Sequence, residues 1–246
     1  MKALINKILK PFNVEMHGKG YLQSLAKGEF KKNAFDVQAG LLDPSKVKVI
    51  IDGGANRGDT IVKYLELFPS ATIHAFEPFP HCLETLSTRF GSEPRVKINA
   101  KALSDNIDQA TFYTNKIEDT NSLYEPQKTG LSSDASCENE GTIVVETVTL
   151  DAYCAENGIG EIGVLKLDLQ GGEYLALQGA KELLKSRKVS LVYAESYFIR
   201  QYKNQPLFYK TATYLDEMGY QLQDIYSPIY GKNCLAWCDT IFLPKM

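Results

Sequence analysis

The sequence predicts an α/β fold in which a doubly wound, mostly parallel sheet follows an N-terminal helical extension. Apolar runs at residues 47–52, 72–76, 162–168 and 189–195 have the length and continuity of strands that are buried on both faces. Segments with helical periodicity separate these runs. This alternation of strand and helix is typical of a doubly wound sheet.

The elements follow one another in a regular order from residue 47 onwards. We expect strands at 47–52, 72–76, 95–99, 162–168 and 189–195, helices at 58–68, 80–89, 151–157, 172–185 and 206–218, and two late strands near 220–225 and 239–243. Residues 109–114 and 142–149 alternate with a period of two, and we expect them to pair as a hairpin. Between them lies a polar stretch, 118–141, interpreted either as a substrate lid or as an excursion without a role.

The sequence of residues 1–46 predicts two or three short helices, and we expect them to cap the domain formed by residues 47–246. A helical stripe near the N-terminus, made of Leu4, Ile5, Ile8, Leu9 and Phe12, is expected to pack on that domain or on a second copy of the chain in a homodimer.

Composition narrows the class of protein. The chain has 246 residues, 44% of them hydrophobic, which is enough for one sizeable core. A net charge of −3 offers no broad attraction to nucleic acid or to an anionic membrane, and no apolar run reaches the length of a membrane span. Five scattered cysteines and the interruption of the first apolar segment by Lys7 and Lys10 favour a reduced, cytoplasmic protein.

A glycine-rich turn after the first strand indicates a cofactor site. The strand ends at Asp52, and Gly53, Gly54 and Gly58 follow at the start of a helix, where the backbone can approach a ligand. The spacing differs from the Gly-x-Gly-x-x-Gly of dinucleotide sites. Asp52 would repel a pyrophosphate but could hold an ammonium group, directly or through water, and amides around Gly54 to Gly58 could receive a carboxylate. S-adenosylmethionine carries both groups.

The second strand also ends at an acid, in Glu77-Pro78-Phe79. An acid at this position of a βαβ unit can accept both ribose hydroxyls of a nucleotide cofactor. We therefore expect Glu77 to bind ribose. The alternative is an ordinary turn that carries a surface acid.

A charged pair near the end of a predicted central strand is a candidate for chemistry. The strand period of two places Lys166 and Asp168 on one side, and a buried lysine needs a carboxylate partner or a task. The next strand ends at Glu195, with Tyr197 just beyond, so Asp168 and Glu195 could face one another. They could orient or deprotonate a hydroxyl or bind a divalent cation, or one of them could simply pair with Lys166.

Other sites are less well supported. Glu173 follows in the first turn of the next helix, where it could complement the helix dipole or take part in catalysis. The three histidines, His17, His74 and His81, lack the spacing of metal ligands, and we expect no bound metal. His74 is interpreted as a packing residue.

Four motifs together resemble the FkbM-type methyltransferases: residues 52–58 (DGGANRG), 76–78 (FEP), 102–104 (ALS) and 166–173 (KLDLQGGE). The resemblance extends over about residues 47–243, and only Gly172 departs from it, where the family often has alanine. It implies a Rossmann-like methyltransferase sheet, S-adenosylmethionine as the cofactor, and transfer to hydroxyl oxygens of sugars, polyketides and related small products.

We therefore expect a methyl donor bound along the strand tips and an acceptor over Asp168 and Glu195. The expected donor-binding residues are Asp52, Gly53, Gly54, Asn56, Gly58, Glu77, Pro78, Phe79, Leu103, Ser104 and Asp168, and the expected catalytic residues are Asp168, Lys166, Glu195 and Tyr197. Two other functions stay open. One is an NAD(P)-dependent oxidoreductase acting on a sugar nucleotide, for which the one Tyr-x-x-x-Lys spacing, Tyr124 to Lys128, contains Pro126. The other is a non-catalytic cofactor-binding protein.

Overall fold

The computed structural model describes residues 33–128, 137–231 and 233–246. The chain divides into two compact units between Asn33 and Ala34, and the description below concerns the second, residues 34–246. The stripe from Leu4 to Phe12 lies outside the described residues. Capping and dimerisation by residues 1–32 therefore stay predictions.

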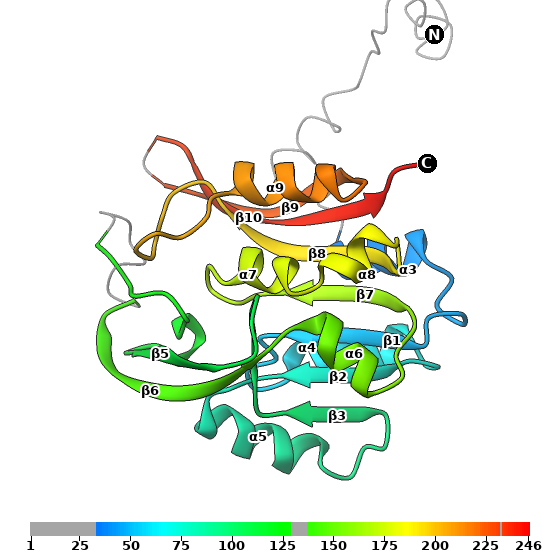
Figure 1. Cartoon of the computed structure of the whole chain (residues 1–246), viewed down its shortest axis with the longest axis horizontal. Coiled ribbons are helices and arrows are strands. Elements are labelled where there is room, and N and C mark those ends of the chain that lie inside the picture. The colour runs from blue at the N-terminus through cyan, green and yellow to red at the C-terminus, as the bar shows by residue number, and fades with distance from the viewer. Residues whose placement is uncertain (1–32, 129–136, 232) are drawn as a thin grey trace, which may run out of the picture. The chain divides into compact units, whose positions relative to one another are not determined.

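A seven-stranded sheet forms the centre of the domain and confirms the predicted fold class (Figure 1). Its order is β3-β2-β1-β7-β8-β10-β9. The strands are β1 (Val49–Gly53), β2 (Thr72–Phe76), β3 (Val96–Asn99), β7 (Ile162–Leu167), β8 (Val189–Tyr197), β9 (Tyr220–Tyr230) and β10 (Leu235–Pro244). The first five are parallel to one another, whereas β10 is antiparallel to both β8 and β9. The strand order reverses between β1 and β7, which is where open α/β sheets bind ligands.

Helices cover both faces of the sheet because its strands carry apolar side chains in both directions. Ile50 points into a core with α3 (Ala34–Leu41), α4 (Asp59–Leu67) and α5 (Pro80–Phe90). Ile51 points into the opposite core, which is built with α6 (Leu150–Glu156), α7 (Glu173–Gln178), α8 (Lys181–Lys185) and α9 (Phe208–Glu217). Neighbouring residues of one strand thus stabilise two separate layers of helices.

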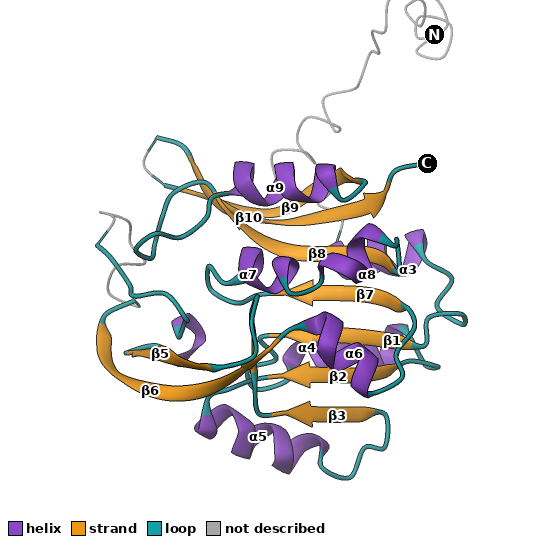
Figure 2. Ribbon diagram, viewed as in Figure 1, coloured by secondary structure: helices purple, strands orange, loops and turns teal. Residues whose placement is uncertain are grey.

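A second sheet of three strands lies beyond the carboxyl ends of the parallel strands (Figures 1 and 2). β5 (Gln109–Asn115) pairs antiparallel with β6 (Asn139–Val148), as the two-residue alternation predicted, and β6 also pairs with the short β4 (Ala102–Leu103). Between β5 and β6, residues 118–120 form the 3-10 helix η2, and Ser122 bridges back to Tyr113. The beginning of the polar stretch is therefore folded against the domain.

Two predicted elements differ from the structure. The helix expected over 172–185 is two helices, which are separated at Gly179 and Ala180, and Gly179 lies so close to Ser104 that an added Cβ atom would be 2.0 Å from its carbonyl oxygen. The late strands are longer than expected. β9 and β10 pair with each other over most of their length, and this non-local pairing overrides the weak apolar pattern of 226–238.

Gly54 provides the first test of the architecture. Its φ is +71°, and an added Cβ atom would lie 1.9 Å from the carbonyl oxygen of Asp168. We expect Gly54→Ala to lower the free energy of unfolding by about 3 kcal/mol or more, because left-handed strain and overlap with backbone add together. Urea denaturation measures the loss.

Gly158 supplies the matched control for that experiment. Its φ is +66°, but an added Cβ atom would meet nothing within 4 Å. Gly158→Ala should therefore cost only the left-handed strain, about 1–2 kcal/mol. Equal losses in the two variants would show that the close approach of β1 and β7 at Gly54 is not a constraint.

Candidate active site

One pocket lies at the carboxyl ends of the parallel strands, at the reversal of strand order. It contains about 900 Å³ of space that protein atoms do not fill, including part of the open solvent. The lining comes from six parts of the chain and consists of Gly54, Asn56, Phe76, Glu77, Pro78, Cys82, Lys101, Ala102, Leu103, Phe112, Glu118, Asp119, Asn121, Leu123, Asp168, Leu169, Gln170 and Glu195.

Glu77 holds the turn of the glycine-rich loop while it lines the pocket. Its Oε2 accepts the backbone N–H of Asn56 and its Oε1 accepts that of Phe79, each at 2.9 Å. Burial raises the pKa of Glu77 to about 7, although both hydrogen bonds favour the charged form. Each oxygen has a further lone pair, so the carboxylate can still accept two hydroxyl groups, as a ribose requires.

Asp52 and Lys166 form a buried ion pair behind this loop. The two residues are opposite one another in the register of β1 and β7, and Lys166 Nζ lies 2.9 Å from Asp52 Oδ1. The ammonium also donates to the carbonyl oxygens of Gly53 at 3.1 Å and Gly54 at 2.7 Å. Burial opposes the charged form of Lys166, yet its pKa is raised, because Asp52 and Asp168 carry the opposite charge.

This pair bears on two expectations. Asp52 is fully buried and does not line the pocket, so its carboxylate is turned toward Lys166 instead of a ligand's ammonium group. The alternative interpretation, that Lys166 pairs with Asp168 or Glu195, is met only by a longer contact of 3.9 Å from Lys166 Nζ to Asp168 Oδ2, because the closer carboxylate is that of Asp52. The physical reason is the strand register, which the sequence pattern does not contain.

The backbone amides of the loop are also engaged within the protein. The N–H groups of Gly54 and Ala55 donate to the carbonyl of Phe76 at 3.0 Å, and that of Gly58 donates to the carbonyl of Ala55 at 2.8 Å. Asn56 donates its N–H to Glu77. The expectation that these four amides receive a ligand carboxylate is therefore wrong for this structure. The loop still approaches the pocket through Gly54 and Asn56, and Asn56 has a positive φ of 49°.

Asp168 and Glu195 meet at the tips of β7 and β8, as expected, and an amide joins them. Nε2 of Gln170 donates to Asp168 Oδ1 and to Glu195 Oε2, both at 2.9 Å. Oε1 of Gln170 lies within hydrogen-bond distance of the Tyr197 and Tyr202 hydroxyls, at 3.2 and 3.0 Å. Burial raises the pKa of Glu195 well above its ordinary value, and the charge of Asp168 raises it further.

Glu173 has a structural task beside these acids. It is buried, it does not line the pocket, and its Oε1 accepts the N–H groups of Leu169 at 2.7 Å and Gly171 at 3.3 Å. Burial raises the pKa of Glu173 to about 7. Its carboxyl group therefore shapes the turn that carries Asp168 and Gln170.

The predicted site residues separate into two groups. Those that line the pocket are Gly54, Asn56, Glu77, Pro78, Leu103, Asp168 and Glu195. Those that do not line it are Asp52, Gly53, Gly58, Phe79, Ser104, Lys166 and Tyr197. His74 is a packing residue, since its Nδ1 lies 2.8 Å from the Tyr153 hydroxyl, and His81 contacts Glu118 outside the pocket.

Sequence reasoning missed several lining residues. Gln170 lies inside the 166–173 motif, so its place in that motif was an available signal. Phe112 was a buried position of a predicted strand. The sequence pattern also did not indicate that the first residues of the polar stretch, Glu118, Asp119, Asn121 and Leu123, line the same pocket as Glu77.

In residues 33–128, 137–231 and 233–246, no three His, Cys, Asp or Glu side chains converge as a metal site would require. No helix in these ranges is long and apolar enough to cross a membrane.

Comparison with known proteins gives a family match. A model described as the methyltransferase FkbM domain matches residues 52–222. A protein named 2-O-methyltransferase NoeI, from Sinorhizobium fredii, is 30% identical over 166 residues, which are 65% of this chain and 65% of the relative. The match thus spans just under two thirds of that relative's length.

Solved structures with a similar chain path are more distant in sequence. An rRNA methylase from Streptococcus thermophilus has a TM-score of 0.47 at 12% identity, covering 87% of this chain and 95% of its own. Magnesium protoporphyrin IX methyltransferase from Synechocystis, with bound S-adenosylmethionine, has a TM-score of 0.45 at 8% identity, covering 99% and 97%.

The buried Glu173 makes stability depend on pH in a defined direction. Its pKa rises from 4.5 to about 7 on folding, so the folded protein binds more protons than the unfolded chain between these values. Stability from this group is complete below about pH 4.5 and is lost as the pH rises through 7. In the original protein the free energy of unfolding should decrease between pH 5 and pH 8 partly because of Glu173. We expect this decrease to be about 3 kcal/mol smaller in Glu173→Gln, which keeps an acceptor for the Leu169 N–H.

Urea denaturation at several pH values measures this slope. Glu182→Gln, at an exposed position of α8, is the matched control and should keep the slope of the original protein. A slope that is the same in all three proteins would contradict the role of Glu173.

Proposed function

The chain belongs to the FkbM methyltransferase family, and we propose that it transfers the methyl group of S-adenosylmethionine to a hydroxyl oxygen of a sugar, a glycan or a small natural product. One observation carries this proposal. The ribose candidate Glu77 and the two acids Asp168 and Glu195 line a single pocket, so that a donor and an acceptor can meet inside it.

The pocket fits the donor in shape and in chemistry. Glu77 would accept the ribose hydroxyls, and Pro78, Ala102 and Leu103 offer apolar surface beside it for the adenine ring. The Gly54 turn leaves no room for a side chain, so the backbone itself forms that edge of the site. When bound, S-adenosylmethionine supplies an activated methyl group on its sulfonium. The protein's part is to align the acceptor with it.

Asp168 and Glu195 are the groups that can act on an acceptor hydroxyl. Gln170 Nε2 donates to both carboxyl groups, and the Tyr197 hydroxyl donates to the same Glu195 oxygen, Oε2. The Asp168 side chain is 47% exposed and lines the pocket, so its carboxylate can take the hydroxyl proton as the oxygen is methylated, whereas burial raises the pKa of Glu195 and favours its neutral form. Alignment should supply most of the rate and proton transfer a smaller factor.

A neutral, hydroxyl-bearing acceptor fits the charges of the pocket. Five acids line it, Glu77, Glu118, Asp119, Asp168 and Glu195, against the single base Lys101. The related NoeI is named for 2-O-methylation, which supports a sugar hydroxyl. The acidic lining and the net charge of −3 disfavour nucleic acid as the acceptor. An oxidoreductase has less support, because Tyr124 and Lys128 do not lie on a helix.

The setting of the protein is part of the proposal. A cytoplasmic location agrees with its cysteines, of which Cys82, Cys137, Cys154 and Cys238 are buried as thiols without disulfides. Dimerisation through the N-terminal stripe is proposed from the sequence pattern, and analytical ultracentrifugation with and without residues 1–32 would test it.

The donor half of the proposal predicts a loss of affinity at Glu77. In Glu77→Gln one charged acceptor of a ribose hydroxyl becomes an amide, so the dissociation constant of S-adenosylmethionine should rise about tenfold or more. Isothermal titration calorimetry measures it. Glu84→Gln, at an exposed position of α5, is the control and should bind as the original protein does. An unchanged affinity in Glu77→Gln would remove Glu77 from the donor site.

The acceptor half of the proposal predicts which class of molecule becomes methylated and how substitutions of the two acids change the rate. With methyl-labelled S-adenosylmethionine and an extract of cells that lack the protein, label should enter the small-molecule or glycan fraction, not the nucleic acids. Asp168→Asn should lower kcat about a hundredfold with little change in donor affinity, and Glu195→Gln should lower it less. EDTA should leave the rate unchanged. A loss of activity in EDTA that magnesium restores would instead make both acids candidate metal ligands.

A further inference from the structure

The segment 118–123 closes the pocket from outside the central sheet. It follows β5 in the three-stranded sheet and begins with η2 (Glu118–Thr120). Glu118, Asp119, Asn121 and Leu123 line the pocket that Gly54 and Glu77 line from the other side. The segment is therefore a wall of the same cavity and not a remote loop.

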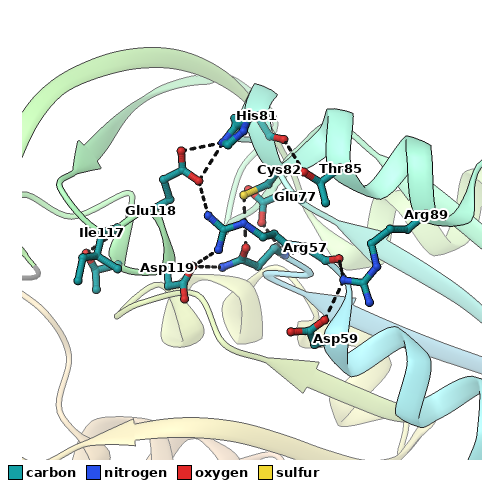
Figure 3. A network of polar contacts seen from close by, with 12 residues as sticks. Arg57, Asp59, Glu77, His81, Cys82, Thr85, Arg89, Ile117, Glu118 and Asp119 are labelled. Carbon is teal, nitrogen blue, oxygen red and sulfur yellow. Dashed lines mark hydrogen bonds and ion pairs between the residues drawn. The ribbon is translucent and has the colours of Figure 1, made fainter.

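Ion pairs fasten this wall to the glycine-rich loop (Figure 3). Arg57 directs Nη2 to Glu118 Oε2 at 2.6 Å and Nη1 to Asp119 Oδ1 at 3.1 Å. Asn56 Nδ2 donates to the same Asp119 oxygen at 3.0 Å, and His81 Nδ1 lies 2.8 Å from Glu118 Oε1. The residues that follow the Gly54 turn thus hold the segment directly.

The other end of the segment is also fixed. Ser122 Oγ donates to the backbone carbonyl of Gln170 at 2.7 Å, and the Ser122 backbone pairs with that of Tyr113. Leu123 packs against the small cluster of Ala102 and Phe112, next to Phe79. The segment therefore spans the pocket between the two loops that carry Asn56 and Gln170.

Asn121 in this segment has a donor that the protein does not use. The residue is 8% exposed and lines the pocket, and its Oδ1 accepts the N–H of Asn115 at 2.7 Å. Its Nδ2 is buried and makes no hydrogen bond. A buried amide without an acceptor costs free energy, and a small rotation of this side chain toward the pocket would let a ligand rich in acceptors relieve that cost. Purine ring nitrogens are such acceptors.

We infer that the 118–123 segment belongs to the methyl-donor site, where Arg57 positions it and the Asn121 amide donates a hydrogen bond to the adenosyl group. This inference rests on the proposed function for its ligand. It assigns residues 118–123 a role that differs from both earlier interpretations of the polar stretch, a substrate lid and an excursion without a role. Arg57 does not line the pocket, so it acts on the donor only through the segment.

The positioning role of Arg57 is tested by calorimetric titration of the full chain with S-adenosylhomocysteine and S-adenosylmethionine. The Arg57 side chain is 43% exposed, so each of its ion pairs contributes modestly. We expect Arg57→Gln to weaken both ligands about threefold to tenfold. Lys116→Gln, which removes an exposed ion pair with Glu138 in the same hairpin, is the control and should bind as before. A change below about twofold in Arg57→Gln would overturn the inference.

The hydrogen bond from Asn121 is tested with Asn121→Asp, which keeps Oδ1 for the Asn115 N–H and replaces the donor nitrogen. We expect about tenfold weaker binding of S-adenosylhomocysteine and of 5′-methylthioadenosine, which lacks the amino-acid part. Asn139→Asp adds the same charge to the hairpin at an exposed residue whose amide donates to the carbonyls of Thr114 and Gly141, and it should bind both ligands normally.

Two results would contradict this assignment. Unchanged binding in Asn121→Asp would show that Asn121 makes no such hydrogen bond. Weaker binding of S-adenosylhomocysteine alone would show that Asn121 contacts the amino-acid part of the ligand and not the adenosyl group. If the original protein binds neither S-adenosylmethionine nor S-adenosylhomocysteine, the proposed function itself fails. If the original protein binds these ligands and the variants bind them equally well, the proposed function stands and only the inference about the 118–123 segment fails.

Discussion

The buried pair of Asp52 and Lys166 is the interaction on which the site depends. Two full charges lie between β1 and β7, and removal of either partner would leave the other buried without compensation, which costs several kcal/mol in proteins. The lysine also holds the carbonyl oxygens of Gly53 and Gly54. One ammonium group therefore joins the two strands at which the sheet reverses its order and fixes the turn that borders the pocket.

Two further buried carboxyl groups, those of Glu77 and Glu173, stabilise other loops around the pocket, and each accepts hydrogen bonds from the backbone of a different loop. Glu77 accepts amides of the loop after β1, and Glu173 accepts amides of the loop after β7. These loops contain Asn56 and Gln170, whose positive φ values of 49° and 51° are unfavourable for residues other than glycine. The hydrogen bonds from the acids hold these conformations in place. The two loops can therefore present side chains to a ligand without rearranging first.

The sequence predicted those features that depend on local pattern. Strand 72–76 was predicted at its observed bounds, and the meeting of Asp168 with Glu195 followed from the rule that neighbouring parallel strands end at one edge. The partner of Lys166 could not be predicted, because it depends on a register between strands far apart in the sequence. The 118–123 segment was also missed, since its polar composition is that of an ordinary loop and its place is set by contacts with Arg57 and Gln170.

Those contacts couple the donor and acceptor sides of the pocket through a continuous set of hydrogen bonds and ion pairs. Arg57 and Asn56 hold one end of the 118–123 segment, and Ser122 holds the other end to the backbone of Gln170. The side chain of Gln170 in turn donates hydrogen bonds to Asp168 and Glu195. A ligand that orders the segment from the donor side therefore also restricts the loop that positions the acids. Arg57 contacts Glu118 and Asp119 of this segment and Gln170 contacts Ser122. Because both residues hold the same segment, the effects of their substitutions on binding and on turnover should not add, whereas those of distant substitutions should.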